Sequence, residues 1–132
     1  MVAQTYLDKP FLVDNLKFDL RIYVLLYGVN PLKIYLFEDG LARFATTPYQ
    51  SAKESDITDL FMHLTNYSIN KKASTFVQNQ NEDGSTAPGE TSTPCHKRSL
   101  KEIYKILEGQ GLSTQDLKDN IEGLIVKTII TG

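Results

Sequence analysis

The sequence predicts an α+β fold, because segments with strand character come first and two amphipathic helices come last. Apolar and polar residues alternate at the start of 18–28, as they do along a strand with one buried face. Apolar residues almost vanish over 77–99 and then return with helical spacing. With 132 residues, 41% of them hydrophobic, the chain can form one domain with a buried core.

Four strands are expected before residue 46, and the last three should form an antiparallel meander. Their expected ranges are 2–6, 18–28, 32–37 and 41–45. Residues 29–31 include Asn-Pro and predict the first turn of the meander. Residues 38–40, Glu-Asp-Gly, predict a tight turn of the Asp-Gly kind before the last strand.

A polar insertion and two helices are expected in the second half. Residues 77–99 can bury too little apolar surface to offset their ordering entropy, so we expect a disordered insertion there. Helices are expected over 99–108 and 113–130, where Ser99 and Ser113 each precede an acidic residue by three positions, the spacing of a capping box. The second helix is strongly apolar, so we expect a larger sheet to cover it than these strands provide.

Composition excludes several classes of protein. A net charge of −2 argues against a general nucleic-acid or membrane-surface binder. The single cysteine, Cys95, excludes an intramolecular disulfide and a multi-cysteine metal site. No apolar run reaches the roughly 18 residues of a membrane span, and no signal peptide is expected, so we expect a cytosolic protein.

One face of the strand predicted at 18–28 and of the residue before it carries charge. Lys17, Asp19 and Arg21 alternate with apolar residues, and side chains two residues apart on a strand share a face. This face is either a solvated surface with ion pairs or a site where Lys and Arg bind a polyphosphate. Arg43 either adds a third cation to that face or pairs with an acidic residue of the preceding turn.

Small hydrogen-bonding side chains are concentrated over 63–70. A short helix or turn is expected over 55–63 and a loop over 65–68. Such residues suit a turn without function as well as they suit a site. The sequence has no glycine-rich phosphate loop, serine-hydrolase elbow or zinc spacing, so a nucleotide site would use charged side chains from strands.

Five ordered blocks together resemble the tubulin tyrosine ligase-like family. They are Gln-Thr-Tyr-Leu at 4–7, Lys-Phe-Asp-Leu-Arg-Ile-Tyr-Val-Leu at 17–25, Gly-Leu-Ala-Arg-Phe-Ala-Thr at 40–46, His-Leu-Thr-Asn-Tyr-Ser-Ile-Asn-Lys at 63–71, and Asn-Ile-Glu-Gly-Leu-Ile-Val-Lys-Thr-Ile at 120–129. The resemblance implies that residues 1–132 are the central part of an ATP-grasp domain, with the insertion at 77–99. It also implies an ATP-dependent ligase that activates a carboxylate as an acyl phosphate, which an amino group then attacks.

The resemblance implies site residues position by position. Those implied to contact ATP are Gln4, Thr5, Tyr6, Leu7, Lys17, Asp19, Arg21, His63, Leu64, Thr65 and Asn66. Those implied to act in catalysis are Lys17, Arg21 and Arg43. The first four would meet adenine, and the charged residues would line the phosphate and acyl-phosphate region. No residue here is assigned to magnesium, whose main ligands in the family lie outside this sequence, so this chain alone is expected to be inactive.

The implied partners are the acidic C-terminal tails of tubulin and a free amino acid, with no nucleic acid and no membrane. Glutamate is favoured, because the block at 63–71 resembles glutamate-adding members more than the tyrosine-adding one. The alternatives are a tyrosine- or glycine-adding ligase, an inactive tubulin-binding module, or an unrelated α+β adaptor. The expected location is the cytoplasm and the microtubule cytoskeleton, cilium and basal body included.

Overall fold

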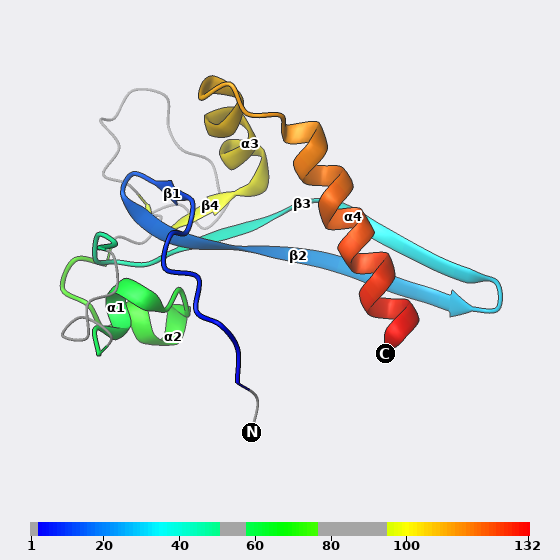
Figure 1. Cartoon of the computed structure of the whole chain (residues 1–132), viewed down its shortest axis with the longest axis horizontal. Coiled ribbons are helices and arrows are strands. Elements are labelled where there is room, and N and C mark those ends of the chain that lie inside the picture. Colours follow the sequence, from blue (N-terminus) through cyan, green and yellow to red (C-terminus); the bar gives the residue numbers. More distant parts are fainter. Residues whose placement is uncertain (1–2, 51–57, 77–94) are drawn as a thin grey trace. The chain divides into compact units, whose positions relative to one another are not determined.

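The computed structural model describes residues 3–50, 58–76 and 95–132 (Figure 1). Its elements in chain order are β1 (Leu12–Val13), β2 (Leu16–Val29), β3 (Leu32–Phe44), α1 (Leu60–His63), α2 (Tyr67–Asn70), β4 (Lys97–Ser99), α3 (Leu100–Gly109) and α4 (Thr114–Thr131). The described strands form a four-stranded sheet in the order β1-β2-β3-β4. The predicted α+β fold, an antiparallel meander followed by two helices, is confirmed.

The chain divides into two compact units. Unit 1 comprises residues 1–19 and 43–97, and unit 2 comprises residues 20–42 and 98–132. The long strands β2 and β3 run through both units, so each unit contains one end of the hairpin.

A tight β1–β2 hairpin opens unit 1. Val13 pairs with Leu16 in antiparallel register across Asp14 and Asn15, whose φ angles are 54° and 61°. Asp and Asn tolerate this left-handed region, which two-residue hairpin turns require. The hairpin was not predicted from the sequence.

Aromatic packing fills the core of unit 1. The rings of Phe18 and Phe44 stack with their centroids 5.3 Å apart, and Phe44 is buried. Val13, Leu16 and Met62 are buried as well. The predicted apolar face of β2 is therefore confirmed at Phe18.

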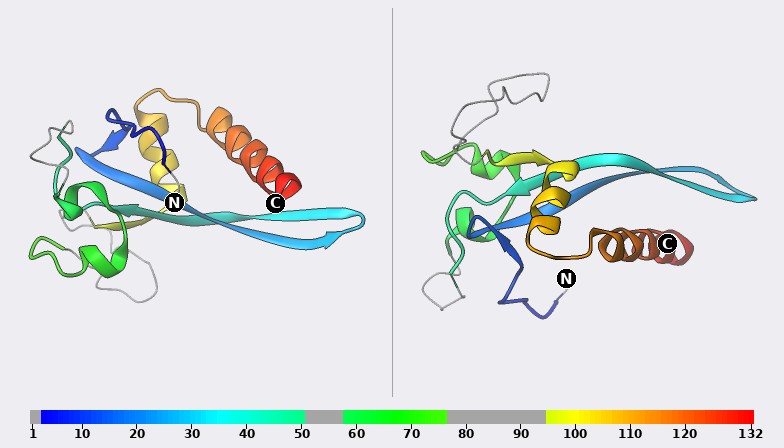
Figure 2. Two further views of the ribbon diagram at one scale, coloured as in Figure 1. Left: turned by 60° about the horizontal axis from the view of Figure 1, so that its bottom comes forward. Right: turned by 90° about the horizontal axis from the view of Figure 1, so that it is seen from above.

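Both long helices lie in unit 2 and begin as predicted. Ser99 accepts a hydrogen bond from the backbone N–H of Glu102, and Ser113 accepts one from Asp116, each at 3.2 Å. Side chains of α3 are buried at Leu100, Ile103 and Leu107. Helix α4 lies over one face of the part of the β2–β3 hairpin in unit 2 (Figure 2), but none of its apolar side chains is buried. Among the described helices, none is long and apolar enough to cross a membrane.

The turn predicted at 38–40 is wrong, because β3 continues through it. A Cβ on Gly40 would meet the backbone oxygen of Arg21 and lie 2.8 Å from Leu100 Cδ1. The side chain of Asp39 accepts hydrogen bonds from the N–H groups of Gly40, at 2.8 Å, and Leu100, at 3.0 Å. The Asp-Gly pair thus lets the start of α3 approach β3 closely, which is a use of glycine other than a turn.

Three further predictions need correction. The strand expected at 2–6 is not formed over 3–6, which are exposed and pair with no strand of the described residues; residue 2 lies outside them. The loop expected at 65–68 is present only at 65–66, because α2 begins at Tyr67. Residues 95–99, placed in the disordered insertion, are ordered: the backbone oxygen of His96 accepts from Phe44 N–H at 3.0 Å, and β4 follows.

One further expectation is confirmed in part, and most of another lies outside the described residues. The short helix expected over 55–63 is present as α1, where Asp59 accepts hydrogen bonds from Phe61 and Met62 N–H. Residues 55–57 lie outside the described residues. The main part of the expected insertion, 77–94, lies outside them as well.

Candidate functional site

The carboxylate of Asp19 is the centre of a polar cluster in unit 1. It accepts from Arg43 Nε at 2.8 Å and Nη2 at 2.6 Å, so the guanidinium binds it in a bidentate fork. It also accepts from the Thr65 hydroxyl at 2.7 Å. Asp19 lies on β2, Arg43 at the end of β3, and Thr65 between α1 and α2. Three segments that are distant in sequence therefore meet at one carboxylate.

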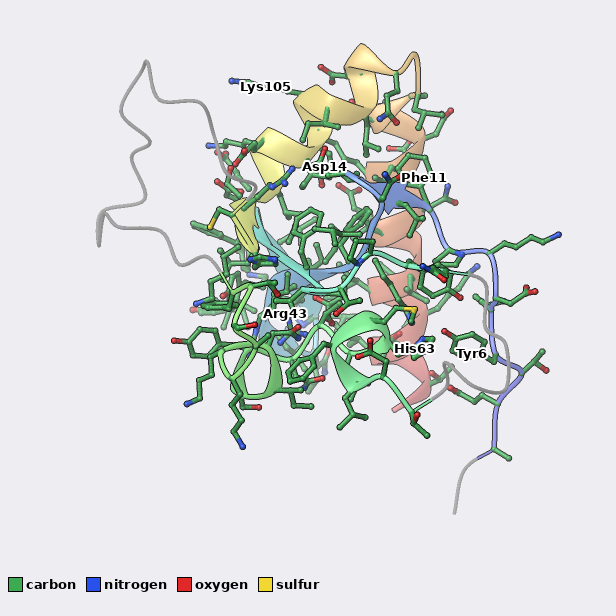
Figure 3. All side chains as sticks on the ribbon, turned by 90° about the vertical axis from the view of Figure 1, so that its left-hand side faces the viewer. Tyr6, Phe11, Asp14, Arg43, His63 and Lys105 are labelled. Carbon is green, nitrogen blue, oxygen red and sulfur yellow. The ribbon has the colours of Figure 1, made fainter. Side chains whose placement is uncertain are left out.

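This cluster fixes the direction of Arg43. Two parallel N–H···O contacts determine both the position and the plane of a guanidinium, whereas a single contact leaves it free to rotate. The two side chains are 25% and 37% exposed, so solvent screens the pair and its contribution to stability is small. The arrangement therefore serves orientation more than stability. Figure 3 labels Arg43 in this cluster.

Lys17 faces the N-terminal segment. Its Nζ lies 5.3 Å from the centroid of the Tyr6 ring, within the range of a cation–π contact. Residues 4–11 and Lys17 line a cavity of about 710 Å³. That volume falls within the range of small-molecule sites. Five of the residues predicted to contact ATP line this cavity: Gln4, Thr5, Tyr6, Leu7 and Lys17.

The hydroxyl of Tyr6 ties this segment to α1. It lies 2.9 Å from Nδ1 of His63 and 3.3 Å from the hydroxyl of Tyr49. Figure 3 shows Tyr6 and His63 close to each other at the edge of unit 1. Two predicted site residues that are far apart in the sequence are therefore in contact.

A buried amide holds the segment that supplies Thr65. Asn70 is 1% exposed, and its Oδ1 accepts from the Thr46 hydroxyl at 2.9 Å. Its Nδ2 donates to the backbone oxygens of Leu64 and Asn66, at 2.7 and 3.1 Å. The predicted residues Leu64 and Asn66 thus lie in a turn that Asn70 organises, and their own side chains are exposed. Sequence reasoning missed Asn70 and Tyr49.

One predicted site residue does not belong to unit 1. Arg21 belongs to unit 2, is exposed, and has no hydrogen bond or ion pair within the described part of the chain. Its convergence with Lys17 and Arg43 stays a prediction. Over the described ranges, no group of three or more His, Cys, Asp or Glu could hold a metal ion. With Asp19 engaged by Arg43 and Thr65, these residues do not fit a magnesium site.

Comparison with known proteins gives a consistent result. The sequence pattern described as the tubulin-tyrosine ligase family matches residues 1–132, the whole chain. The chain belongs to the tubulin-tyrosine ligase family. The resemblance seen in the five blocks is therefore confirmed, and the described fold is consistent with part of the ATP-grasp domain of that family.

Several curated relatives in the tubulin-tyrosine ligase family are similar over nearly the full chain. A probable beta-tubulin polyglutamylase of Tetrahymena thermophila is 46% identical over 131 residues, which is 99% of this chain and 10% of that protein. A tubulin monoglutamylase of Mus musculus is 41% identical over the whole chain, which is 10% of its length. A tubulin polyglutamylase of the same species is also 41% identical, over 13% of its length. The chain therefore spans a small part of each of these relatives.

Proposed function

We propose that this chain is the central part of a longer ATP-dependent ligase that adds glutamate to tubulin. The observation that carries the proposal is the bidentate Asp19–Arg43 pair, which lies in the same unit as the cavity formed by residues 4–11. The family membership supports a tubulin-modifying ligase, and the names of the relatives favour glutamate as the added residue. We expect the protein in the cytoplasm, on microtubules.

The proposed reaction proceeds in two displacements. An oxygen of the acceptor carboxylate on tubulin attacks the γ-phosphorus of ATP, and ADP leaves to give an acyl phosphate. The amino group of free glutamate then attacks the acyl carbon and loses a proton. Phosphate leaves with the former carboxylate oxygen, and an amide bond remains. Both steps place negative charge on oxygens that fixed cations can stabilise.

Each side chain of the site has a proposed task in this reaction. Residues 4–7 bind the adenine, with the Tyr6 ring against the base, and Lys17 neutralises phosphate charge. Arg43, oriented by Asp19, faces the reacting phosphoryl and carboxyl oxygens. Arg21 is proposed to extend the same set of cations. Magnesium would shield phosphate charge when bound, with ligands from outside the described residues.

A direct assay separates glutamate ligation from its alternatives. The full-length protein that carries this sequence would be incubated with tubulin, ATP and one labelled amino acid at a time: glutamate, glycine or tyrosine. We expect incorporation of glutamate alone, and only with ATP. Incorporation of glycine or tyrosine would instead assign another activity within the family. Tubulin binding without any incorporation would indicate an inactive binding module.

Tyr6→Ala is expected to weaken ATP binding by roughly tenfold, since stacking of a base on an aromatic ring contributes about 1–3 kcal/mol. The ring lines the cavity and contacts Lys17, so its loss acts on the bound base directly. Isothermal titration calorimetry of the full-length protein would measure the dissociation constant. Tyr27→Ala is the matched control, because Tyr27 is 70% exposed in unit 2. Equal ATP affinities of the Tyr6→Ala and Tyr27→Ala variants would show that Tyr6 does not bind the nucleotide.

A further inference from the structure

Tyr49 links three segments of unit 1. Its hydroxyl donates to the backbone oxygen of Asp8 at 2.9 Å and lies 3.3 Å from the hydroxyl of Tyr6. Its ring meets that of His63 edge-on, with centroids 5.9 Å apart. Its own backbone N–H donates to the backbone oxygen of Asn15 at 2.8 Å. The residue is therefore attached at both its backbone and its hydroxyl.

The segment next to Tyr49 has few other anchors. Residues 4–8 belong to no strand or helix and make no backbone–backbone hydrogen bond within the described part of the chain. Tyr6 itself is 49% exposed, so burial does not hold its ring in one place. The contacts of the Tyr6 hydroxyl and of the Asp8 oxygen are thus the polar attachments of this segment.

The three contacts have a single arrangement of hydrogens that satisfies all of them. Since Tyr49 gives its one hydroxyl hydrogen to Asp8, the contact between the two hydroxyls requires Tyr6 to donate to Tyr49. Tyr6 then has no hydrogen left for His63, so Nδ1 of His63 must carry the hydrogen and donate. Burial is the largest cause that raises the pKa of Tyr49 to about 12, so the hydroxyl remains protonated at neutral pH and can donate to Asp8.

We propose that Tyr49 is a positioning residue for nucleotide binding: it ends a directed chain of hydrogen bonds, from His63 through Tyr6 to Tyr49 and the Asp8 carbonyl. This chain holds residues 4–8 in the shape that receives adenine. The proposal rests on the proposed function, because it assumes that the cavity beside these residues binds ATP. Hydrogen bonds in such a chain polarise one another, so removal of one member weakens the others.

Tyr49→Phe removes the hydroxyl and keeps the ring contact with His63. In the full-length protein we expect the dissociation constants of both ATP and ADP to rise roughly tenfold, the effect of losing about two neutral hydrogen bonds. Ligation at saturating ATP should change less than about twofold, because bound adenine is the same in the ground state and the transition state. Tyr35→Phe is the control, since its hydroxyl has no hydrogen bond to the described residues. Unchanged ATP and ADP affinities in Tyr49→Phe would overturn the proposal.

The state of the His63 ring gives a second readout that does not need ATP. Nitrogen NMR of ¹⁵N-histidine-labelled protein should show hydrogen on Nδ1 in the wild type. In Tyr49→Phe, Tyr6 can donate to Nδ1 instead, so the hydrogen should move to Nε2. Wild-type protein with Nε2 protonated and Nδ1 bare would contradict the directed chain. Absence of ATP binding in wild-type protein with the expected ring state would overturn the nucleotide role and the proposed function, but not the chain itself.

Discussion

Arg43→Ala in the full-length protein is expected to lower glutamate ligation at saturating ATP by about a hundredfold or more, and to change ATP affinity far less. The reason is that Arg43 is proposed to meet charge that develops during the reaction, whereas the adenine contacts are the same before and during it. Removal of one such donor raises a barrier by roughly 3 kcal/mol. Single-turnover ligation rates and ATP titrations of the same preparation would measure the two effects.

Two further variants sharpen this test. Arg43→Lys keeps the positive charge but loses the fork that binds Asp19, so we expect it to restore only part of the rate. Lys101→Ala removes an exposed cation on α3 and should leave the rate unchanged. A near-normal ligation rate of Arg43→Ala would contradict the catalytic role proposed for Arg43. The Asp19–Arg43 pair would then be only an ion pair on a partly exposed surface.

Asn70→Ala is expected to lower the free energy of unfolding by about 3 kcal/mol, because a buried side chain that makes three hydrogen bonds is lost. The Thr46 hydroxyl and the backbone oxygen of Leu64 would lose this partner, whereas the backbone oxygen of Asn66 would keep the N–H groups of Ile69 and Asn70. Urea unfolding, followed by fluorescence and circular dichroism, would measure the change. Loosening of this turn should also weaken the Thr65 contact with Asp19 and slow ligation.

Asn66→Ala is the matched control for stability. It makes the same chemical change four residues earlier, on an exposed side chain that makes no cap hydrogen bond. We expect its free energy of unfolding to stay within about 0.5 kcal/mol of the wild type. If Asn70→Ala were equally mild, water would have to replace all three hydrogen bonds, and Asn70 would not organise the segment.

The parts of the fold that the sequence predicted correctly depend on local chemistry. Ser99 and Ser113 stand at the starts of α3 and α4, because a serine hydroxyl can satisfy the free N–H groups of a first turn from its own position in the chain. The turn expected at Asp39-Gly40 was wrong because this pair acts through distant contacts. Its local preference is a turn, but here the absence of a Cβ on Gly40 lets Leu100 and the Arg21 backbone approach closely.

The candidate site was predictable to a similar extent. Strand alternation was enough to expect charged side chains on one face of β2, but Arg43 was expected on a separate third strand. It meets Asp19 because β3 continues through the predicted turn and lies beside β2. Thr65 joins them from 46 residues away, which no spacing rule could indicate. Asn70 and Tyr49 were missed, because a buried amide and an anchoring hydroxyl look like ordinary turn residues in a single sequence. Their roles depend on partners that only the folded chain brings near.

The proposed acyl phosphate can be tested by following oxygen from the acceptor to phosphate. A peptide with the sequence of a tubulin tail, its side-chain carboxylates labelled with ¹⁸O, would be incubated with the full-length protein, ATP and glutamate. Mass spectrometry would then read the isotope content of the released phosphate. Activation of the acceptor by ATP predicts one ¹⁸O in phosphate for each glutamate added. Phosphate without ¹⁸O, released while glutamate is incorporated, would contradict the proposed mechanism.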